Sequence, residues 1–253
     1  MYVSFKFAFT DARLWKNIVD ALSSLVDEVV FIADENSLRA RAMDPSHVAM
    51  VDFELPKAAF NEYECSGEVK LGINLEDMSR IMRRAGGGDE LELSFDPEKN
   101  KLNVTFKGTS IRTFKIGLLD LTHEETPVPS IKFNAEIKMT ADALKEALKD
   151  AEVVSDHVEV EASSEELKIT ASGDTGGVEV KLDKSSDALL ELNVTEESKA
   201  MYALSYLMDM MKATAASDTV TVQFSTSMPI KLEFNIIGGG RLTYWLAPRI
   251  EAE

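Results

Sequence analysis

An internal repeat is the feature of this sequence that most restricts its fold. When the chain is aligned with itself at an offset of 129 or 130 residues, four segments repeat the same pattern of apolar and polar positions. Few residues are identical, yet four matches at nearly one offset indicate that one folding unit has been duplicated. The paired segments are 9–22 with 139–152, 27–44 with 156–173, 75–85 with 204–214, and 89–95 with 218–224. At 253 residues, the chain can form two domains of about 120 residues each.

Each copy predicts a strand, a helix, several strands, a second helix and further strands. The segments "VVFIADENSLRARAM" (29–43) and "LELSFDPEKNKLNVTF" (91–106) alternate apolar and polar residues and are interrupted by polar turn residues. This pattern is typical of antiparallel hairpins. Many strands with only two helices per copy predict an α+β fold, with the helices on one face of an antiparallel sheet.

A proline-containing segment separates the two copies. Residues 118–134 read "LLDLTHEETPVPSIKFN", and Pro127 and Pro129 favour an extended connector over a helix. We therefore expect an N-terminal domain at 1–117, an interdomain connector at 118–134 and a C-terminal domain at 135–253.

The segment "LEDMSRIMRRAGGG" (75–88) predicts a helix with an arginine-rich outer face. Asn74 is a favourable N-cap, and the glycines at 86–88 end the helix. At 3.6 residues per turn, the apolar residues fall on one side and Arg80, Arg83 and Arg84 on the other. For a single helix, an ordinary solvated face is the simpler interpretation.

The repeat supplies three more helices for comparison. Thr10 and Thr140 are the expected N-caps of the helices at 11–22 and 141–152. Three apolar stripes are expected to be buried: Leu14, Ile18, Ala21, Leu22 and Leu25; Leu144, Ala147, Leu148 and Ala151; and Leu204, Leu207, Met208 and Met211. The candidate phosphate-contacting residues on or near the opposite faces are Arg13, Lys16, Arg80, Arg83, Arg84, Lys145, Lys149, Lys199 and Lys212.

These basic residues are unusual because the whole chain carries a formal net charge of −17. An acidic protein repels phosphate at long range, so any contact with DNA has to be local. Physiological salt screens charges beyond about 8 Å, which makes such a local contact workable. Lysine and arginine without interleaved aromatic residues indicate contact with phosphates and no reading of bases.

Several other classes of protein are disfavoured by the composition. One cysteine and three scattered histidines argue against a disulfide framework and a zinc site. Phosphate-binding glycine loops and a serine nucleophile motif are missing, so we expect no enzyme, no catalytic residue, no metal and no cofactor. No stretch is apolar enough to span a membrane, and residues 1–16 do not form a signal peptide. We therefore expect a soluble, intracellular protein.

Four motifs in this order closely resemble the proliferating cell nuclear antigen family, the DNA sliding clamps of archaea and eukaryotes. They are "MDPSHVAMV" (43–51), "LEDMSRIMRRAG" (75–86), "LLDL" (118–121) and "LTYWLAPRI" (242–250), and the resemblance covers the whole chain. The short C-terminus is similar to archaeal members. The resemblance implies two tandem copies of a DNA-clamp fold, assembled as a trimeric ring with sheets outside and helices lining a hole around duplex DNA. It also implies the function of a processivity factor for DNA polymerase in replication and repair. Such a protein would be cytoplasmic and associated with the nucleoid in an archaeal cell, or nuclear in a eukaryotic one.

The resemblance also marks the positions at which family members carry DNA-facing basic residues. Family members place basic residues where this chain has Lys16, Arg80, Lys149 and Lys212, whereas Asn17, Glu146 and Ser205 stand where relatives often carry a base.

The resemblance further implies a groove that would bind short peptide motifs of a DNA polymerase, a clamp loader, a flap nuclease and a ligase. Its expected residues are Met43, His47, Val48, Met50, Leu121, Val128, Pro129, Pro229, Trp245, Ala247, Pro248 and Ile250.

The implied subunit interface pairs an edge strand of each domain. Its residues are Thr109, Ser110, Ile111, Arg112, Thr113, Phe114, Lys115 and Ile116 on one side, and Gly176, Gly177, Val178, Glu179, Val180, Lys181 and Leu182 on the other. Two alternatives to a homotrimer stay open. The chain could be one subunit of an obligate heterotrimer, or an acidic two-domain scaffold that binds proteins and does not encircle DNA.

Overall fold

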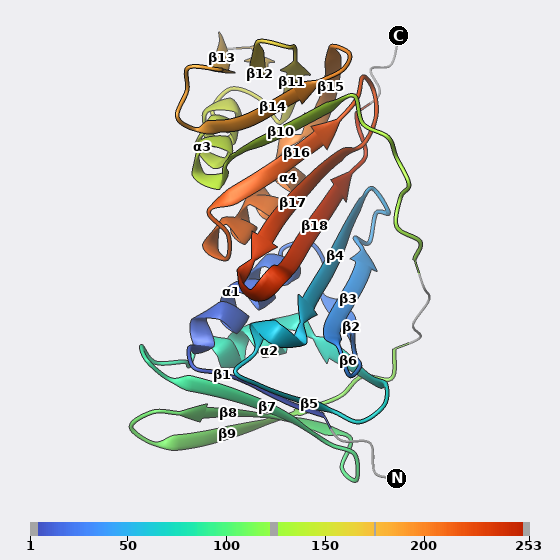
Figure 1. The fold of residues 1–253 in the computed structure, drawn as a ribbon, viewed down its shortest axis with the longest axis vertical. Helices are drawn as coiled ribbons and strands as arrows, with labels where there is room; N and C mark the ends of the chain where they lie inside the picture. Colours follow the sequence, from blue (N-terminus) through green and yellow to red (C-terminus); the bar gives the residue numbers. More distant parts are fainter. Residues whose placement is uncertain (1–4, 122–125, 175, 250–253) are drawn as a thin grey trace. The chain divides into compact units, whose positions relative to one another are not determined.

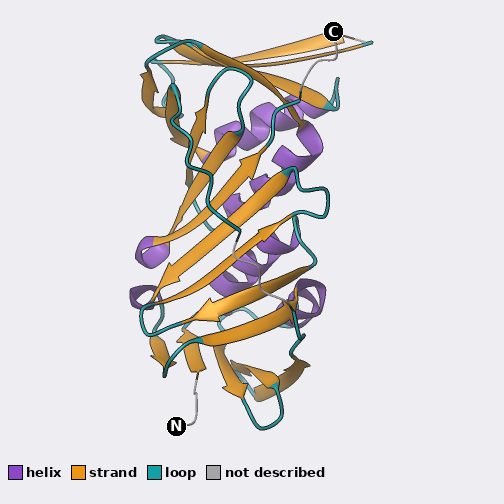
Figure 2. Cartoon of the chain, turned by 90° about the vertical axis from the view of Figure 1, so that its right-hand side faces the viewer, coloured by secondary structure: helices purple, strands orange, loops and turns teal. Residues whose placement is uncertain are grey.

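The computed structural model describes residues 5–121, 126–174 and 176–249 and divides the chain into two compact units. The first unit consists of Met1–Pro45, Val51–Thr126 and Ile236–Leu242, and the second of Ser46–Met50, Pro127–Asn235 and Thr243–Glu253. Strands make up most of each unit, and the helices are shorter segments between them (Figures 1 and 2). The predicted α+β class, with antiparallel sheets and two α-helices in each copy, is confirmed.

The first unit contains two antiparallel sheets and two helices. One sheet has the strand order β5-β1-β7-β8-β9, and the other strands follow the order β4-β3-β2-β6. Helices α1 and α2 pack on each other and on β1 and β6, respectively. The elements are β1 (Phe5–Phe9), α1 (Ala12–Ser23), β2 (Glu28–Ala33), β3 (Ser37–Met43), β4 (Ala49–Pro56), η1 (Lys57–Ala59), β5 (Glu62–Cys65), β6 (Val69–Asn74), α2 (Leu75–Met82), β7 (Glu90–Asp96), β8 (Lys101–Lys107) and β9 (Ile111–Gly117).

The second unit repeats this arrangement. One sheet has the order β13-β12-β11-β15, and the others follow β14-β10-β16-β17. Helix α3 packs on α4 and on β10, β11 and β12. The elements are β10 (Ala135–Thr140), α3 (Ala141–Glu152), β11 (His157–Ala162), β12 (Glu166–Gly173), β13 (Gly176–Asp183), β14 (Leu189–Val194), β15 (Ser198–Ala203), α4 (Leu204–Met210), η2 (Met211–Ala215), β16 (Thr219–Phe224) and β17 (Ile230–Ile236). Two further elements follow in the chain: the short helix η3 (Ile237–Gly239), which belongs to the first unit, and strand β18 (Gly240–Leu246), whose residues up to Leu242 belong to the first unit and whose remaining residues belong to the second.

An aromatic cluster forms the core of the first unit, and one of its members was not predicted. Trp15 is 1% exposed, and its ring centroid lies 5.2 Å from that of Phe7 and 5.5 Å from that of Phe31. Leu14, expected in the buried stripe of α1, is only half-buried. The prediction was wrong at this position because the buried stripe of α1 runs through Ala12, Trp15, Val19 and Leu22, which are three or four residues apart.

Two further details of the helices differ from the expectation. Asp11, and not Thr10, is the N-cap of α1, since its carboxylate accepts a hydrogen bond from the amide of Arg13 at 2.9 Å. In α4, Met210 is buried whereas Met208 is half-exposed. Helix α4 ends at Met210 and continues as the tighter helix η2, which rotates the following side chains relative to an ideal α-helix.

Candidate functional site

The basic residues of α1 lie on its exposed side, next to carboxylates of the same helix. Arg13 forms an ion pair with Asp11, and Lys16 donates to Asp20 at 2.5 Å. The second oxygen of Asp20 accepts a hydrogen bond from the hydroxyl of Ser79 at 2.9 Å, which ties α1 to α2. The positive charges of α1 are therefore offset locally.

The arginines of α2 differ from one another in their surroundings. Arg80 is held between Glu76 at 3.0 Å and Asp77 at 3.2 Å. The helix ends at Met82, earlier than predicted, so Arg83 is its C-cap and Arg84 lies in the following turn. Arg83 and Arg84 are exposed, and within the described part of the chain neither side chain forms an ion pair. These two arginines form a positive turn that no neighbouring carboxylate neutralises.

Two lysines of the second unit resemble the basic residues of α1, because each is paired with a nearby carboxylate. Lys149 pairs with Glu146 at 2.7 Å, and Lys212, which lies on η2, pairs with Asp209 at 3.0 Å. The hydrogen bond that Lys149 donates to Glu146 raises the pKa of this lysine, so it stays protonated. Lys145 is half-buried and donates to the hydroxyl of Thr214 at 3.3 Å. Only Lys145 among these three has a neutral partner.

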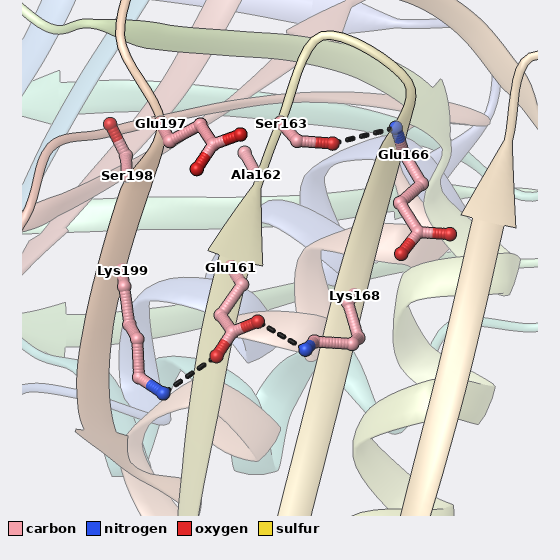
Figure 3. A pocket seen from close by; sticks show the side chains of 8 residues that line it. All are labelled: Glu161, Ala162, Ser163, Glu166, Lys168, Glu197, Ser198 and Lys199. Carbon is pink, nitrogen blue, oxygen red and sulfur yellow. Dashed lines mark hydrogen bonds and ion pairs between the residues drawn. The ribbon is translucent and has the colours of Figure 1, made fainter.

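Lys199 does not belong to this helix surface. It lies on β15 opposite Glu161 of β11, and its ammonium group is 2.7 Å from Glu159 and 2.6 Å from Glu161. Figure 3 shows Glu161 between Lys199 and Lys168 on strands that line a polar pocket of about 410 Å³. The buried residues Val158 and Val160 face α3, so Lys199 points away from the helices. The prediction placed Lys199 near the start of the fourth helix, but the residues before α4 form strand β15, so Lys199 does not join the basic residues of the helices.

The predicted groove residues belong to both units, and the contacts described here join residues of the second unit. The amide of Ala247 donates to the carbonyl of Val48 at 2.8 Å, which brings the C-terminal segment beside the segment at 46–50. Val48 and Val128 are 39% and 42% exposed. Met43 and Leu121 belong to the first unit, and Ile250 lies outside the described residues. The exposed or half-exposed members in the second unit are His47, Val48, Val128, Pro129, Pro229, Ala247 and Pro248.

Two expected groove residues are buried, and one exposed neighbour was missed. Met50 and Trp245 are 4% and 7% exposed, so they support the surface from below. The ammonium group of Lys231 lies 6.0 Å from the centroid of the Trp245 ring. Met228 is 39% exposed, and its carbonyl accepts a hydrogen bond from the hydroxyl of Tyr202 at 2.8 Å. A methionine directly before Pro229 was the sequence signal for this additional apolar position.

The two predicted interface strands are both edge strands. Strand β9 is last in β5-β1-β7-β8-β9 (Figure 1), and β13 is first in β13-β12-β11-β15. Ile111 is 75% exposed, whereas Ile116 and Leu182 are buried. Thr109 and Ser110 belong to the turn before β9, and the remaining predicted residues lie on the two strands.

The hydrogen-bond pattern shows which backbone groups are free on each edge. Next to the β8–β9 pair, the amide of Leu118 donates to the carbonyl of Asn100 at 3.2 Å. Next to the β11–β12 pair, the amide of Ser163 donates to the carbonyl of Glu166 at 3.0 Å. Bonded and non-bonded pairs alternate in antiparallel ladders. With the observed registers, the N–H and C=O groups that point to the free side belong to Ile111, Thr113, Lys115 and Gly117 on β9 and to Gly177, Glu179, Lys181 and Asp183 on β13.

Two features are absent from the described residues: a cluster of metal ligands and a membrane-spanning helix. No three His, Cys, Asp or Glu side chains among them are arranged to hold a metal ion. No helix in the described segments is long and apolar enough to cross a membrane. The thiol of Cys65 donates to the carbonyl of Gly67 at 3.2 Å, and burial, together with the nearby carboxylates of Asp34 and Glu35, raises its pKa to about 11.

We expect Cys65 to react slowly with thiol reagents in the folded protein. With a pKa of about 11, roughly one thiol in a thousand is ionised at pH 8, compared with about a quarter for a free cysteine. The rate of modification by a chromogenic disulfide should rise about tenfold per pH unit up to pH 10. Unfolding in guanidinium should abolish this protection, and a folded-state rate equal to the unfolded rate at pH 8 would contradict the prediction.

The chain matches family models over nearly its whole length. Residues 4–125 match the N-terminal domain and residues 127–249 the C-terminal domain of proliferating cell nuclear antigen. A DNA polymerase sliding clamp of Methanococcus maripaludis is 42% identical over 250 residues, covering 97% of this chain and 99% of the relative. One of Pyrococcus horikoshii is 38% identical over 247 residues, covering 98% and 99%.

A solved structure supports the same assignment. The crystal structure of PCNA from Thermococcus kodakaraensis matches with a TM-score of 0.93 and 30% identity, covering 97% of this chain and all of that one. The two family models, the curated relatives and the solved structure therefore agree. The chain belongs to the proliferating cell nuclear antigen family.

Proposed function

We propose that this protein is a DNA polymerase sliding clamp, a ring of three copies that encircles duplex DNA and acts as a processivity factor. The observation that carries the proposal is the match of both domains to the family, together with relatives named DNA polymerase sliding clamp that align from end to end. The free edges of β9 and β13 support head-to-tail assembly, because two unlike edges can close a ring and remove each other's unpaired backbone groups.

In this proposal, the helices face the phosphates of the encircled duplex. The ring would hold a polymerase on DNA by topology, so tight DNA binding would hinder sliding. The offset charges of Arg13, Lys16, Arg80, Lys149 and Lys212 fit weak contact. Arg83, Arg84 and Lys145 would supply the main attraction, independent of base sequence and sensitive to salt. The protein would perform no catalysis and need no cofactor.

A second part of the proposal concerns protein partners. The exposed apolar residues at Val48, Val128 and Met228 would form a docking surface above Trp245 for a short peptide with a glutamine and two aromatic side chains. Burying one such aromatic side chain stabilises a complex by about 4–6 kcal/mol before association costs. Micromolar affinity then follows, which suits the exchange of polymerase, loader, nuclease and ligase. The amide of Leu119 donates to the carbonyl of Gly72, and the carbonyl of Thr126 accepts from Arg41, so these two positions of the expected connector pack within the first unit.

We expect Val48→Glu to weaken binding of a fluorescent peptide of this type by about tenfold or more, because a carboxylate would be buried without a partner. Val48 is 39% exposed, so the fold should tolerate the substitution. Val153→Glu is the matched control, since Val153 is 81% exposed at the end of α3 and is not one of the predicted groove residues. Equal peptide titrations for the two variants would remove Val48 from the docking surface.

The function is tested by mass and by topology. Native mass spectrometry should give three times 28.0 kDa, about 84 kDa. After loading onto a nicked circular plasmid, the protein should remain bound through gel filtration and leave when the plasmid is linearised. A stable 28.0 kDa species that is retained only with a paralogue would indicate a heterotrimer subunit. Retention that is unaffected by linearisation would contradict encirclement.

A further inference from the structure

The side chain of Arg112 joins two elements that the proposed function treats separately. Arg112 belongs to edge strand β9, but its guanidinium group points inward, 5.4 Å from the centroid of the Phe106 ring. Its Nη1 atom donates to the carbonyl oxygen of Arg84 at 2.9 Å, and its Nη2 atom donates to the carboxylate of Asp89. One side chain thus links the strand edge to the turn that carries Arg83 and Arg84.

Asp89 makes this link rigid because its carboxylate is enclosed. The side chain is 8% exposed, and it accepts a second hydrogen bond from the amide of Gly86 at 2.6 Å. A Cβ atom at Gly108 would lie 2.0 Å from the Asp89 carboxylate, so glycine is needed at that position. The backbone carbonyl of Asp89 also accepts from the amide of Ala12 at the start of α1. A buried carboxylate with a charged partner is costly to disturb, since removing the partner leaves an uncompensated charge.

The turn between α2 and β7 depends on these contacts. Its sequence continues into three glycines at 86–88, and Gly88 has a φ of +83°. Glycine-rich backbone has many accessible conformations unless other groups restrict it. The carbonyl of Arg84 lies just beyond the C-terminal end of α2, where a guanidinium group also interacts favourably with the helix dipole.

We propose that Arg112 is a positioning residue for phosphate contact: it fixes the turn that presents Arg83 and Arg84, neither of which forms an ion pair with any described residue. The DNA-related part of this inference rests on the proposed function, whereas the positioning itself does not. Arg112 acts through the backbone of the turn and contacts no DNA. The free edge of β9 and the arginine turn therefore move together.

Hydrogen exchange of the free protein tests the positioning directly. In Arg112→Gln, amides in peptides covering 83–89 should exchange about tenfold faster, as expected from losing hydrogen bonds to a charged group. Peptides covering 135–152 in the second unit should be unchanged. Arg112→Lys should recover thermal stability, because its ammonium group can pair with Asp89. Exchange in the turn should stay fast, because one ammonium group cannot bond to both the Asp89 carboxylate and the Arg84 carbonyl as the guanidinium group does. The control is Lys99→Gln, which removes a cation paired with Asp96 in the β7–β8 turn. Unchanged exchange at 83–89 in both Arg112 variants would overturn the proposal.

A double-mutant cycle tests the consequence for DNA. The affinity for a labelled duplex is measured by anisotropy for Arg112→Gln, for Arg83→Gln with Arg84→Gln, and for all three together, at concentrations where native mass spectrometry shows equal assembly. Arg112→Gln should weaken binding by about threefold to tenfold in the otherwise unchanged protein and have no further effect when both arginines are absent. A full additional loss in the triple variant would mean that Arg112 acts independently of the turn. If the unchanged protein does not bind duplex DNA, the proposed function fails, while the exchange experiment still decides the positioning role.

Discussion

Thr113→Pro is expected to convert a species of about 84 kDa, three times 28.0 kDa, into a folded monomer. The N–H group of Thr113 points to the free side of β9, so proline removes a donor from the proposed interface and none from the β8–β9 ladder. Each joint would lose one hydrogen bond of about 1 kcal/mol and bury an unsatisfied carbonyl at a cost of about 1–3 kcal/mol. Native mass spectrometry at micromolar concentration measures the result, and circular dichroism checks the fold.

The free groups on the two edges predict a specific register for this joint. If Thr113 lies opposite Lys181 in an antiparallel pair, all four free residues of β9 meet all four of β13. The same register places Phe114 beside Val180 on the inner face and Lys115 beside Glu179 on the outer face. A shift by two residues loses a bonded pair and separates Lys115 from Glu179. Full overlap and charge complementarity therefore favour one register.

Two further sets of variants test this register. Thr113→Val keeps the N–H group and a β-branched shape, so it should remain at about 84 kDa, three times 28.0 kDa. Lys115→Glu should weaken assembly by up to about 1 kcal/mol per joint, and adding Glu179→Lys should restore part of the loss. Trimers of Thr113→Pro with unchanged stability would exclude β9 from the interface.

The sequence predicted the architecture well because it depends on periodicity. The duplication, the antiparallel hairpins and the buried stripe of α3 all follow from local patterns that survive in the structure. The errors lie where two adjacent helix positions could each be the buried one, or where an α-helix ends or becomes a 3-10 helix earlier than expected. Trp15 replaced Leu14 in the core, and α2 ended at Met82 before reaching the glycines.

Long-range contacts could not be predicted from one sequence. Asp89 and Arg112 are 23 residues apart and meet only because of the strand register and the α2–β7 turn. Lys199 was placed near a helix by spacing, whereas its side chain belongs to the outer face of a sheet. The groove residues came from the family resemblance, and nothing local indicated that Val48 would bond to Ala247. Chemistry that depends on tertiary neighbours, such as charge compensation, requires the structure.

Arg83→Gln combined with Arg84→Gln is expected to lower the affinity for duplex DNA by about tenfold at physiological salt. Both side chains are exposed without an ion pair in the described part of the chain, so they can release counterions from phosphates. The slope of log K against log salt should fall by about 0.9 for each arginine that contacts a phosphate. Fluorescence anisotropy with a labelled duplex, titrated over a range of salt concentrations, measures both quantities.

The comparison variant is Lys149→Gln with Lys212→Gln, which changes the net charge by the same amount. These lysines are already paired with Glu146 at 2.7 Å and Asp209 at 3.0 Å, so a phosphate would have to compete with a carboxylate for each of them. Their removal should leave the salt slope unchanged and reduce affinity by no more than about threefold. If both variants lose the same affinity, DNA responds to the overall charge of the helices. If only the arginine variant loses slope, contact is concentrated at the turn after α2, and local compensation of charge would explain how the proposed ring, built from acidic chains, holds DNA loosely enough to slide.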